Sequence, residues 1–295
     1  WERPSKVLPV ESCLFKTKSF IIGNKRKTKM KKVKMDGYDP IVLTKATEKV
    51  VIDGNKRKYA RLARPLRFYG GTTSAIEVGC NLRCKFCFSD APVRNPHTTG
   101  KLYTPEQVFN ALSKSARKYG HKLISASASE GTLGKQHLFE LLELVDKSEF
   151  IYVLETNGMT IGHDPDFAKE LSRFRNLHVR ISIKGTNKQE YVRLTGAMSS
   201  SYDLPYKALE HLMAAGVSCN VCLSISFSSP ENIKKAEERL AAIRPGLLKS
   251  LEKEHITLFP KVYKRLSNLG MMPNTFRFGG KILEKKIPLL MEREK

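Results

Sequence analysis

The sequence predicts an α/β fold, a partial (β/α)6 TIM-like barrel with a basic, β-hairpin-containing appendage at its N-terminus. From about residue 73, short β-branched apolar runs alternate with amphipathic stretches of helical period, which is typical of parallel strands joined by crossover helices. About six such units fit into the following 200 or so residues, too few for a closed eight-unit barrel. An open doubly wound sheet is the structural alternative, because periodicity does not separate the two.

Each strand of the barrel is expected at an apolar run. These runs are residues 74–78, 122–127, 151–155, 178–183, 217–227 and 255–259. A helix is expected to begin at Thr104-Pro-Glu-Gln107, where a capping box is combined with Pro at the first helical position. Asp164-Pro165 and Ser229-Pro230 begin two further helices, and another helix ends at Gly216. The loops after the strands are the candidate site, because they carry the chemistry in such folds.

The N-terminal quarter has a different pattern. Gly-Asn-Lys-Arg-Lys occurs at residues 23–27 and again at 54–58, and both copies are expected to be basic turns of β-hairpins. Residues 1–70 hold 19 Lys and Arg against 6 Asp and Glu, so they carry more than half of the net charge of +23. We therefore expect a basic β-rich appendage at 1–72, the barrel at 73–263 and a C-terminal tail at 264–295.

A net charge this high predicts a polyanionic partner, for which RNA is the natural choice. The alternative is that charged hairpin tips only keep exposed sheet edges soluble. No apolar run of about 18 residues is present and no signal-peptide pattern begins the chain, so we expect a cytoplasmic protein without a membrane partner. The candidate contacts to nucleic acid are Lys25, Arg26, Lys27, Lys56, Arg57, Lys58, Arg61 and Arg64.

Three cysteines with the spacing C-x3-C-x2-C, Cys80, Cys84 and Cys87, follow the first expected strand. In a long chain expected inside the cell, such crowding favours a metal site over disulfides. Three ligands around an iron–sulfur cubane leave one iron open, whereas clusters that only transfer electrons normally have four protein ligands. A zinc site completed by Cys13 or His97, and a loop of structural cysteines, are the alternatives.

With an aromatic residue before the last cysteine, the motif resembles the signature of the radical S-adenosylmethionine (radical SAM) superfamily. The resemblance implies that Cys80, Cys84 and Cys87 hold a [4Fe-4S] cluster whose open iron chelates S-adenosylmethionine (SAM). It also implies that an electron from the cluster cleaves SAM to methionine and a 5′-deoxyadenosyl radical, which abstracts hydrogen from a substrate. A reductant such as ferredoxin or flavodoxin is the expected electron donor.

Segments after the later strands extend the resemblance. Ser127-Ala-Ser-Glu130-Gly is similar to the family's Gly-Gly-Glu segment, which receives the methionine amino group, although Ala128 and Ser129 replace the two glycines. Leu154-Glu-Thr-Asn-Gly158 resembles the segment near the cofactor ribose, and either segment could instead be a simple strand-ending turn. Residues 179–185 resemble strands of molybdenum-cofactor cyclases and glycyl-radical activating enzymes. The implied SAM contacts are Phe86, Ser129, Glu130, Thr156, Asn157, Ser182 and Lys184.

The alternation within residues 179–185 has its own meaning. It places Arg180, Ser182 and Lys184 on one face of a central strand, and such a strand is normally covered on both faces, so the polar face needs a polar destination. Cys219 and Cys222 lie inside another expected strand, where residues three apart point to opposite faces. We therefore interpret these two as buried structural cysteines and not as ligands of a second cluster.

Four functions are compatible with these patterns. A radical SAM enzyme that modifies tRNA or rRNA is favoured by the charge. A protein- or peptide-modifying enzyme such as a glycyl-radical activator, and a small-molecule enzyme of cofactor biosynthesis, are the alternatives within the family. A zinc-dependent RNA-binding module without enzymatic activity is the alternative outside it.

Overall fold

Six parallel strands make up the centre of the sheet in residues 37–284, the part of the chain that the computed structural model describes. They pair in the order of the sequence, and every one of these pairings is parallel. The six are β3 (Thr72–Glu77), β5 (Leu123–Ser127), β6 (Ile151–Thr156), β7 (Leu177–Lys184), β8 (Cys219–Ser224) and β9 (Glu252–Glu254).

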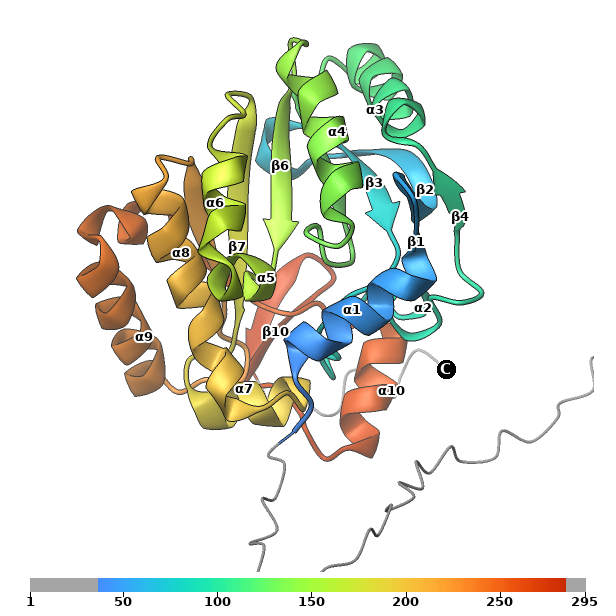
Figure 1. The fold of residues 1–295 in the computed structure, drawn as a ribbon. Coiled ribbons are helices and arrows are strands. Elements are labelled where there is room, and N and C mark those ends of the chain that lie inside the picture. The colour runs from blue at the N-terminus through green and yellow to red at the C-terminus, as the bar shows by residue number, and fades with distance from the viewer. Residues whose placement is uncertain (1–36, 285–295) are drawn as a thin grey trace, which may run out of the picture. The chain divides into compact units, whose positions relative to one another are not determined.

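The helices that connect these strands cover one face of the sheet (Figure 1). A doubly wound sheet reverses its strand order at one point and has helices on both faces. Here the order runs one way, and right-handed crossovers without a reversal bring every connecting helix to the same side. The partial (β/α)6 barrel is therefore confirmed, and the doubly wound alternative is wrong.

The helices begin where the sequence supplies caps. Thr104 and Gln107 form the expected capping box of α3, and Asp164 and Ser229 cap α6 and α9 with Pro in the first turn of each. In the described residues none of the helices is long and apolar enough to cross a membrane. Their bounds are α1 (Pro40–Val51), α2 (Ala91–Arg94), α3 (Pro105–Tyr119), α4 (Lys135–Asp146), α5 (Met159–His163), α6 (Pro165–Leu171), α7 (Lys188–Thr195), α8 (Leu204–Ala214), α9 (Pro230–Ile243) and α10 (Pro260–Asn268).

Residues 37–66 are part of the barrel unit and not an appendage. After α1, β1 (Ile52–Asp53) pairs antiparallel with β2 (Lys56–Leu66), so the hairpin expected at residues 54–58 is confirmed, while residues 23–27 lie outside the described part. β2 then pairs antiparallel with β3 and with β4 (Lys101–Tyr103). A domain boundary at residue 72 is wrong, because it falls where β3 begins and the compact unit already includes residues 37–72.

The sixth parallel strand lies at β9, and the prediction of a strand at 255–259 is wrong. Residues 255–259 form only a bridge, from Thr257 to Arg277 of β10 (Thr275–Phe278), which makes a hairpin with β11 (Lys281–Glu284). Ile256 and Leu258 are buried, which explains why the run resembled a strand. β9 itself has the sequence Glu-Lys-Glu, which carries no apolar signal.

The two faces of the parallel sheet differ in chemistry. Along β7 the residues alternate strictly between buried and half-buried, and the buried ones are Leu177, Val179, Ile181 and Ile183. They belong to the apolar core beneath the helices, and we call this side the helix-covered face. The other side, called the polar face below, carries side chains that bond to one another within a strand or across neighbouring strands: Ser74, Ser127, Arg180, Ser182, Lys184, Asn220, Ser224, Glu252 and Glu254. The polar surroundings expected for Arg180, Ser182 and Lys184 of β7 are therefore on the inner side of the curved sheet.

Candidate active site

The three cysteines lie on the loop that follows β3. The turn into this loop is made at Gly79, whose φ is +95° and where a Cβ atom would lie 2.9 Å from Thr47 Cγ2 of α1. Only glycine meets both conditions, so α1 presses directly on the start of the loop. Cys80, Cys84 and Cys87 are all free thiols, and all three lie on this one loop.

Each cysteine carbonyl of this loop accepts a hydrogen bond from a different arginine. Arg83 donates to the Cys80 carbonyl, Arg94 to the Cys84 carbonyl at 3.0 Å, and Arg265 of α10 to the Cys87 carbonyl. Asp90 in turn forms ion pairs with Arg265 at 3.1 Å and with Lys261 at 3.0 Å. The loop is thus surrounded by cations, which favours negative charge at its centre.

The thiols themselves fit an iron–sulfur cluster. Burial raises the pKa of the Cys84 thiol to about 12, although Lys184 acts in the opposite direction, and burial also raises the pKa of Cys80. Such thiols keep their protons unless a metal cation stabilises the thiolate. The Leu82 N–H lies 3.4 Å from Cys80 Sγ and the Asn157 amide nitrogen lies 3.9 Å from it, and N–H groups toward sulfur are a normal feature of cluster sites.

Glu130 lies at the centre of the loop after β5, residues 128–134, which we call the Glu130 loop. Its carboxylate is buried, and Oε1 accepts bonds from the Thr132 N–H at 3.1 Å, the Thr132 hydroxyl at 2.7 Å and the Thr156 hydroxyl. Among residues 37–284, Oε2 accepts only the Asn157 N–H, at 2.9 Å. One acceptor position of Oε2 is thus left over, since a carboxylate has about four.

Asn157 joins this network to the cysteine loop. Its side-chain amide donates to the Asn81 carbonyl oxygen Oδ1 at 2.7 Å, and the Asn81 amide donates to Thr44 Oγ1 of α1 at 2.9 Å. Three loops, those after β3, β5 and β6, are therefore held in one hydrogen-bonded unit. The alternative that residues 154–158 only end a strand leaves these bonds unexplained.

The polar face lies beside this unit. The Lys184 ammonium donates to Ser182 Oγ, and its pKa is raised because the carboxylate of Glu254 and the sulfur of Cys84 outweigh the effect of its burial. Arg180 binds Glu252 at 2.7 Å across β8. Burial raises the pKa of Glu155, whose carboxylate faces Arg180 and Lys184. A separate cavity of about 460 Å³ opens at the amino ends of the strands, between Ile151, His178 and Tyr69, and so at the far end from the cysteines.

Comparison with protein-family models matches residues 76–243 to the radical SAM superfamily. The chain belongs to the radical SAM superfamily. Members of this superfamily are enzymes that use a [4Fe-4S] cluster and SAM.

Similarity to individual proteins is lower and covers only part of the chain. The FeMo cofactor biosynthesis protein NifB of Frankia alni is 27% identical over 124 residues, which is 40% of this chain and 24% of NifB. The structure of SuiB from Streptococcus suis bound to SAM has 15% identity and a TM-score of 0.48, with 65% of this chain and 45% of SuiB covered. The structure of anSMEcpe with bound SAM has 22% identity and a TM-score of 0.45, with 65% and 57% covered. The chain thus spans well under two thirds of each of these proteins.

Two of the implied SAM contacts of this radical SAM protein have other partners within the chain. Phe86 is buried, with its ring 6.0 Å from the ring of Phe227. The Ser129 hydroxyl donates to the Glu77 carbonyl at 2.8 Å. Ala128, one of the residues that replace the family's glycines, has a φ of +74°, so it adopts the left-handed conformation that glycine would adopt more easily.

The nucleic-acid candidates separate into distinct groups. Arg57 was the wrong choice, because its side chain is fully buried and its guanidinium lies against Glu77. The Lys58 ammonium donates to the carbonyls of Pro96 and His97, and Arg64 is half-buried, whereas Lys56 and Arg61 are exposed. Lys25, Arg26 and Lys27 lie outside the described residues, as does Cys13 of the zinc alternative. Within residues 37–284, no three His, Cys, Asp or Glu side chains stand close enough to hold a single metal ion.

Several residues that shape the site were not identified from the sequence. Tyr38 accepts the Arg83 N–H at 2.7 Å, and Glu48 accepts the Gly134 N–H at 2.9 Å, so the segment before β3 helps to hold the cysteine loop and the Glu130 loop. Glu77, the charged last residue of β3, is buried. A signal for Glu77 was present, since it is the one carboxylate in an otherwise apolar and hydroxyl-bearing strand. No local pattern marks Tyr38 or Glu48.

Proposed function

We propose that Cys80, Cys84 and Cys87 hold the [4Fe-4S] cluster of this radical SAM enzyme and that the adjoining strand ends hold SAM. The observation that carries the proposal is the hydrogen-bonded unit of Glu130, Thr156 and Asn157, which reaches Cys80. When bound, the cluster supplies the electron that cleaves the sulfonium of SAM and leaves a 5′-deoxyadenosyl radical for hydrogen abstraction. A reductant such as ferredoxin or flavodoxin would provide that electron.

The chain's own residues have separate tasks in this proposal. Glu130 orders the loops through Oε1 and offers the remaining position of Oε2 to the ammonium group of SAM. Lys184 stays charged and offers its ammonium to the carboxylate of SAM, with Ser182 fixing its direction. Thr156 and Asn157 position the backbone between these two charges. The buried setting strengthens each of these interactions.

Anaerobic reconstitution tests the assignment of the cysteines. The wild-type chain should take up about four irons and cleave SAM to 5′-deoxyadenosine under reduction, as a three-cysteine site predicts. Cys84→Ala should lose both properties. Cys219→Ala, a change at a half-buried cysteine of β8 outside the loop, is the matched control and should retain both. Full iron content in Cys84→Ala, or its loss in Cys219→Ala, would contradict the proposal.

An RNA substrate is supported by charge. The chain carries a net charge of +23, and Lys56 and Arg61 are exposed along β2. Binding of tRNA or rRNA to the full chain should weaken steeply as salt rises, because each phosphate contact releases counterions. Lys56→Glu combined with Arg61→Glu should reduce this slope, whereas Lys114→Glu on α3 should not. Binding no tighter than that of a neutral polymer at low salt would rule out RNA and favour a peptide or small-molecule substrate. A cytoplasmic location remains part of the same proposal.

A further inference from the structure

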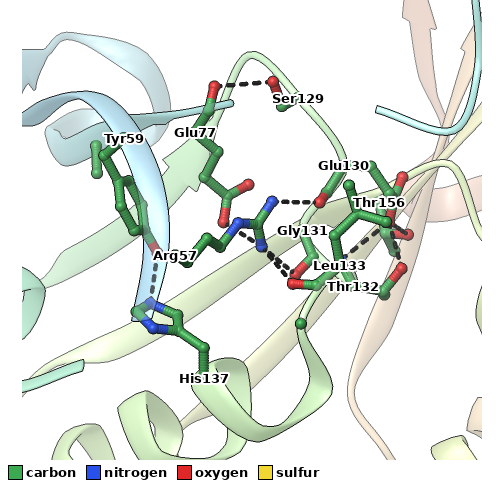
Figure 2. Close-up of polar contacts among 12 residues, drawn as sticks. Arg57, Tyr59, Glu77, Ser129, Glu130, Gly131, Thr132, Leu133, His137 and Thr156 are labelled. Carbon is green, nitrogen blue, oxygen red and sulfur yellow. Dashed lines mark hydrogen bonds and ion pairs between the residues drawn. The ribbon is translucent and has the colours of Figure 1, made fainter. Parts of the chain in front are cut away.

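Arg57 is buried between β3 and the Glu130 loop, and its guanidinium makes contacts to both (Figure 2). Nη1 donates to the Gly131 carbonyl at 3.1 Å and to the Leu133 carbonyl at 2.9 Å, and Nη2 donates to the Glu130 carbonyl at 2.6 Å. On the other side Nη1 lies 3.0 Å from Glu77 Oε1. Three carbonyls of one short loop are therefore fixed by a single side chain from β2.

The contact between Arg57 and Glu77 does not have the geometry expected of an ion pair whose role is only to stabilise the fold. A paired arginine and carboxylate usually meet through two parallel hydrogen bonds. Here Arg57 Nε and Glu77 Oε2 are both buried and have no hydrogen-bond partner among the described residues. A buried ion pair of this kind also adds little net stability compared with well-packed apolar side chains. What an apolar pair could not provide is the set of three donors directed at the loop.

The Glu130 loop also packs against β6. A Cβ atom at Gly131 would lie 2.6 Å from Leu154 Cδ1 and 2.8 Å from the Glu155 carbonyl oxygen, so the loop lies directly on β6. Beyond the loop, Tyr59 of β2 reaches His137 at the start of α4, with 2.9 Å between Tyr59 Oη and His137 Nε2. The loop thus has β6 on one side and Arg57 on the other, and its carbonyls cannot turn without breaking bonds to Arg57.

We propose that Arg57 is a positioning residue for SAM: it holds the carbonyls of Glu130, Gly131 and Leu133 so that the loop presents its polar groups to the methionine part of the cofactor. The inference rests on the proposed function, in which the Glu130 loop receives SAM. Glu77 is the counter-charge that allows a guanidinium to be buried there. The substitution of Ala128 for a glycine makes such external support more important, because the left-handed conformation at Ala128 is strained.

The test uses the full chain with its cluster reconstituted, in four forms: wild type, Arg57→Lys, Glu77→Gln and Tyr59→Phe. Arg57→Lys keeps a positive charge beside Glu77 but cannot direct bonds at three carbonyls. Glu77→Gln removes the counter-charge and keeps the loop contacts. Tyr59→Phe removes a buried hydrogen bond from the same strand and touches no loop carbonyl.

The measurements for each form are iron content, stability to urea, the dissociation constant for SAM, and amide hydrogen exchange in residues 130–134. We expect Arg57→Lys to keep its iron, to bind SAM at least tenfold more weakly than wild type and to exchange faster in the loop. Glu77→Gln and Tyr59→Phe should lose stability to urea and yet bind SAM within about twofold of wild type. The SAM-dependent change in the electron paramagnetic resonance signal of the reduced cluster should require correspondingly more SAM in Arg57→Lys alone.

Two results would overturn the inference. One is wild-type affinity and wild-type loop exchange in Arg57→Lys. The other is a loss of SAM affinity in all three variants in proportion to their loss of stability, which would make Arg57 a structural residue only. Failure of the proposed function would look different, because wild type itself would then either take up no cluster or take it up and not bind SAM. The exchange measurement would still report on whether Arg57 orders the loop.

Discussion

The helix-covered face and the polar face of the sheet are formed by the same strands, but different interactions dominate on each. On β7, Val179, Ile181 and Ile183 are fully buried in the apolar core, and between them Arg180, Ser182 and Lys184 form bonds to other polar groups. Apolar burial stabilises a fold in proportion to area, whereas buried charges contribute little net stability. The comparison indicates that one face holds the barrel together and that the other provides its chemistry.

The largest effect should come from the helix-covered face. Ile181→Ala deletes a fully buried side chain from the core beneath the helices and should lower the free energy of unfolding by about 2–5 kcal/mol. SAM affinity, measured below the unfolding transition, should stay within about twofold of wild type. Urea unfolding and SAM titration check the two halves of this prediction, and a large loss of affinity with little loss of stability would break the distinction between the faces.

Glu77 should give the next largest effect, as a dependence on pH. Burial raises the pKa of its carboxyl to about 7, against the pull of Arg57 in the opposite direction. Between the lower pKa of the unfolded chain and pH 7, the folded state binds more protons, so the contribution of Glu77 to stability falls as pH rises through this window. Relative to Glu77→Gln, the wild type should lose about 1–3 kcal/mol of unfolding free energy between pH 5 and pH 8. Urea unfolding of both proteins at several pH values measures this, and a difference that does not vary with pH would show that Arg57 keeps Glu77 ionised throughout.

Lys184 tests the polar face directly. Lys184→Met keeps most of the side-chain volume and removes the ammonium that is placed beside Cys84 and Glu254. We expect at least a tenfold rise in the dissociation constant for SAM, about 1.4 kcal/mol, with a much smaller change in stability. Val179→Ala on the opposite face of the same strand is the control. Unchanged SAM affinity in Lys184→Met would remove Lys184 from the proposed site.

The smallest expected effect is a gain in the free energy of unfolding, at Ala128. Ala128 has a φ of +74°, a conformation that costs an alanine roughly 1 kcal/mol more than a glycine. Ala128→Gly should therefore raise the free energy of unfolding, by less than this amount because glycine also gives the unfolded chain more freedom. Thermal unfolding with Ala126→Gly as a control in regular strand geometry measures the difference. A loss of stability at position 128 equal to that at 126 would show that Ala128 is not strained.

The parallel strands could largely be predicted because their signal is local. Apolar runs such as residues 151–155 and caps such as Thr104 and Asp164 determine strands and helices without reference to distant residues. β9 was missed because its glutamates are directed at Arg180, Asn220 and Ser224, so its pattern depends on partners remote in sequence. The cysteine motif could be identified because its signal is local, as that of β9 is not.

Arg57 shows why other parts of the site could not be assigned from sequence. In Lys56-Arg57-Lys58 three cations are adjacent, and charge alone suggests one exposed basic turn. Alternation in β2 instead sends Arg57 and Tyr59 inward and leaves Lys56 exposed, and the partners of Arg57 lie more than 70 residues away in the Glu130 loop. The alternation can be read in the sequence. Only the structure shows that Arg57 lies against the Glu77 carboxylate and three carbonyls of the Glu130 loop.

The segment before β3 also determines how much of this chain has to be transferred when its chemistry is moved into another protein. The family match begins at residue 76, after Tyr38, Thr44, Glu48 and Arg57, and it ends at residue 243, before Arg265. These side chains hold the cysteine loop or the Glu130 loop from outside those bounds. A chimera cut at the limits of family similarity would retain every cysteine of the motif and would lose these five supports of the two loops.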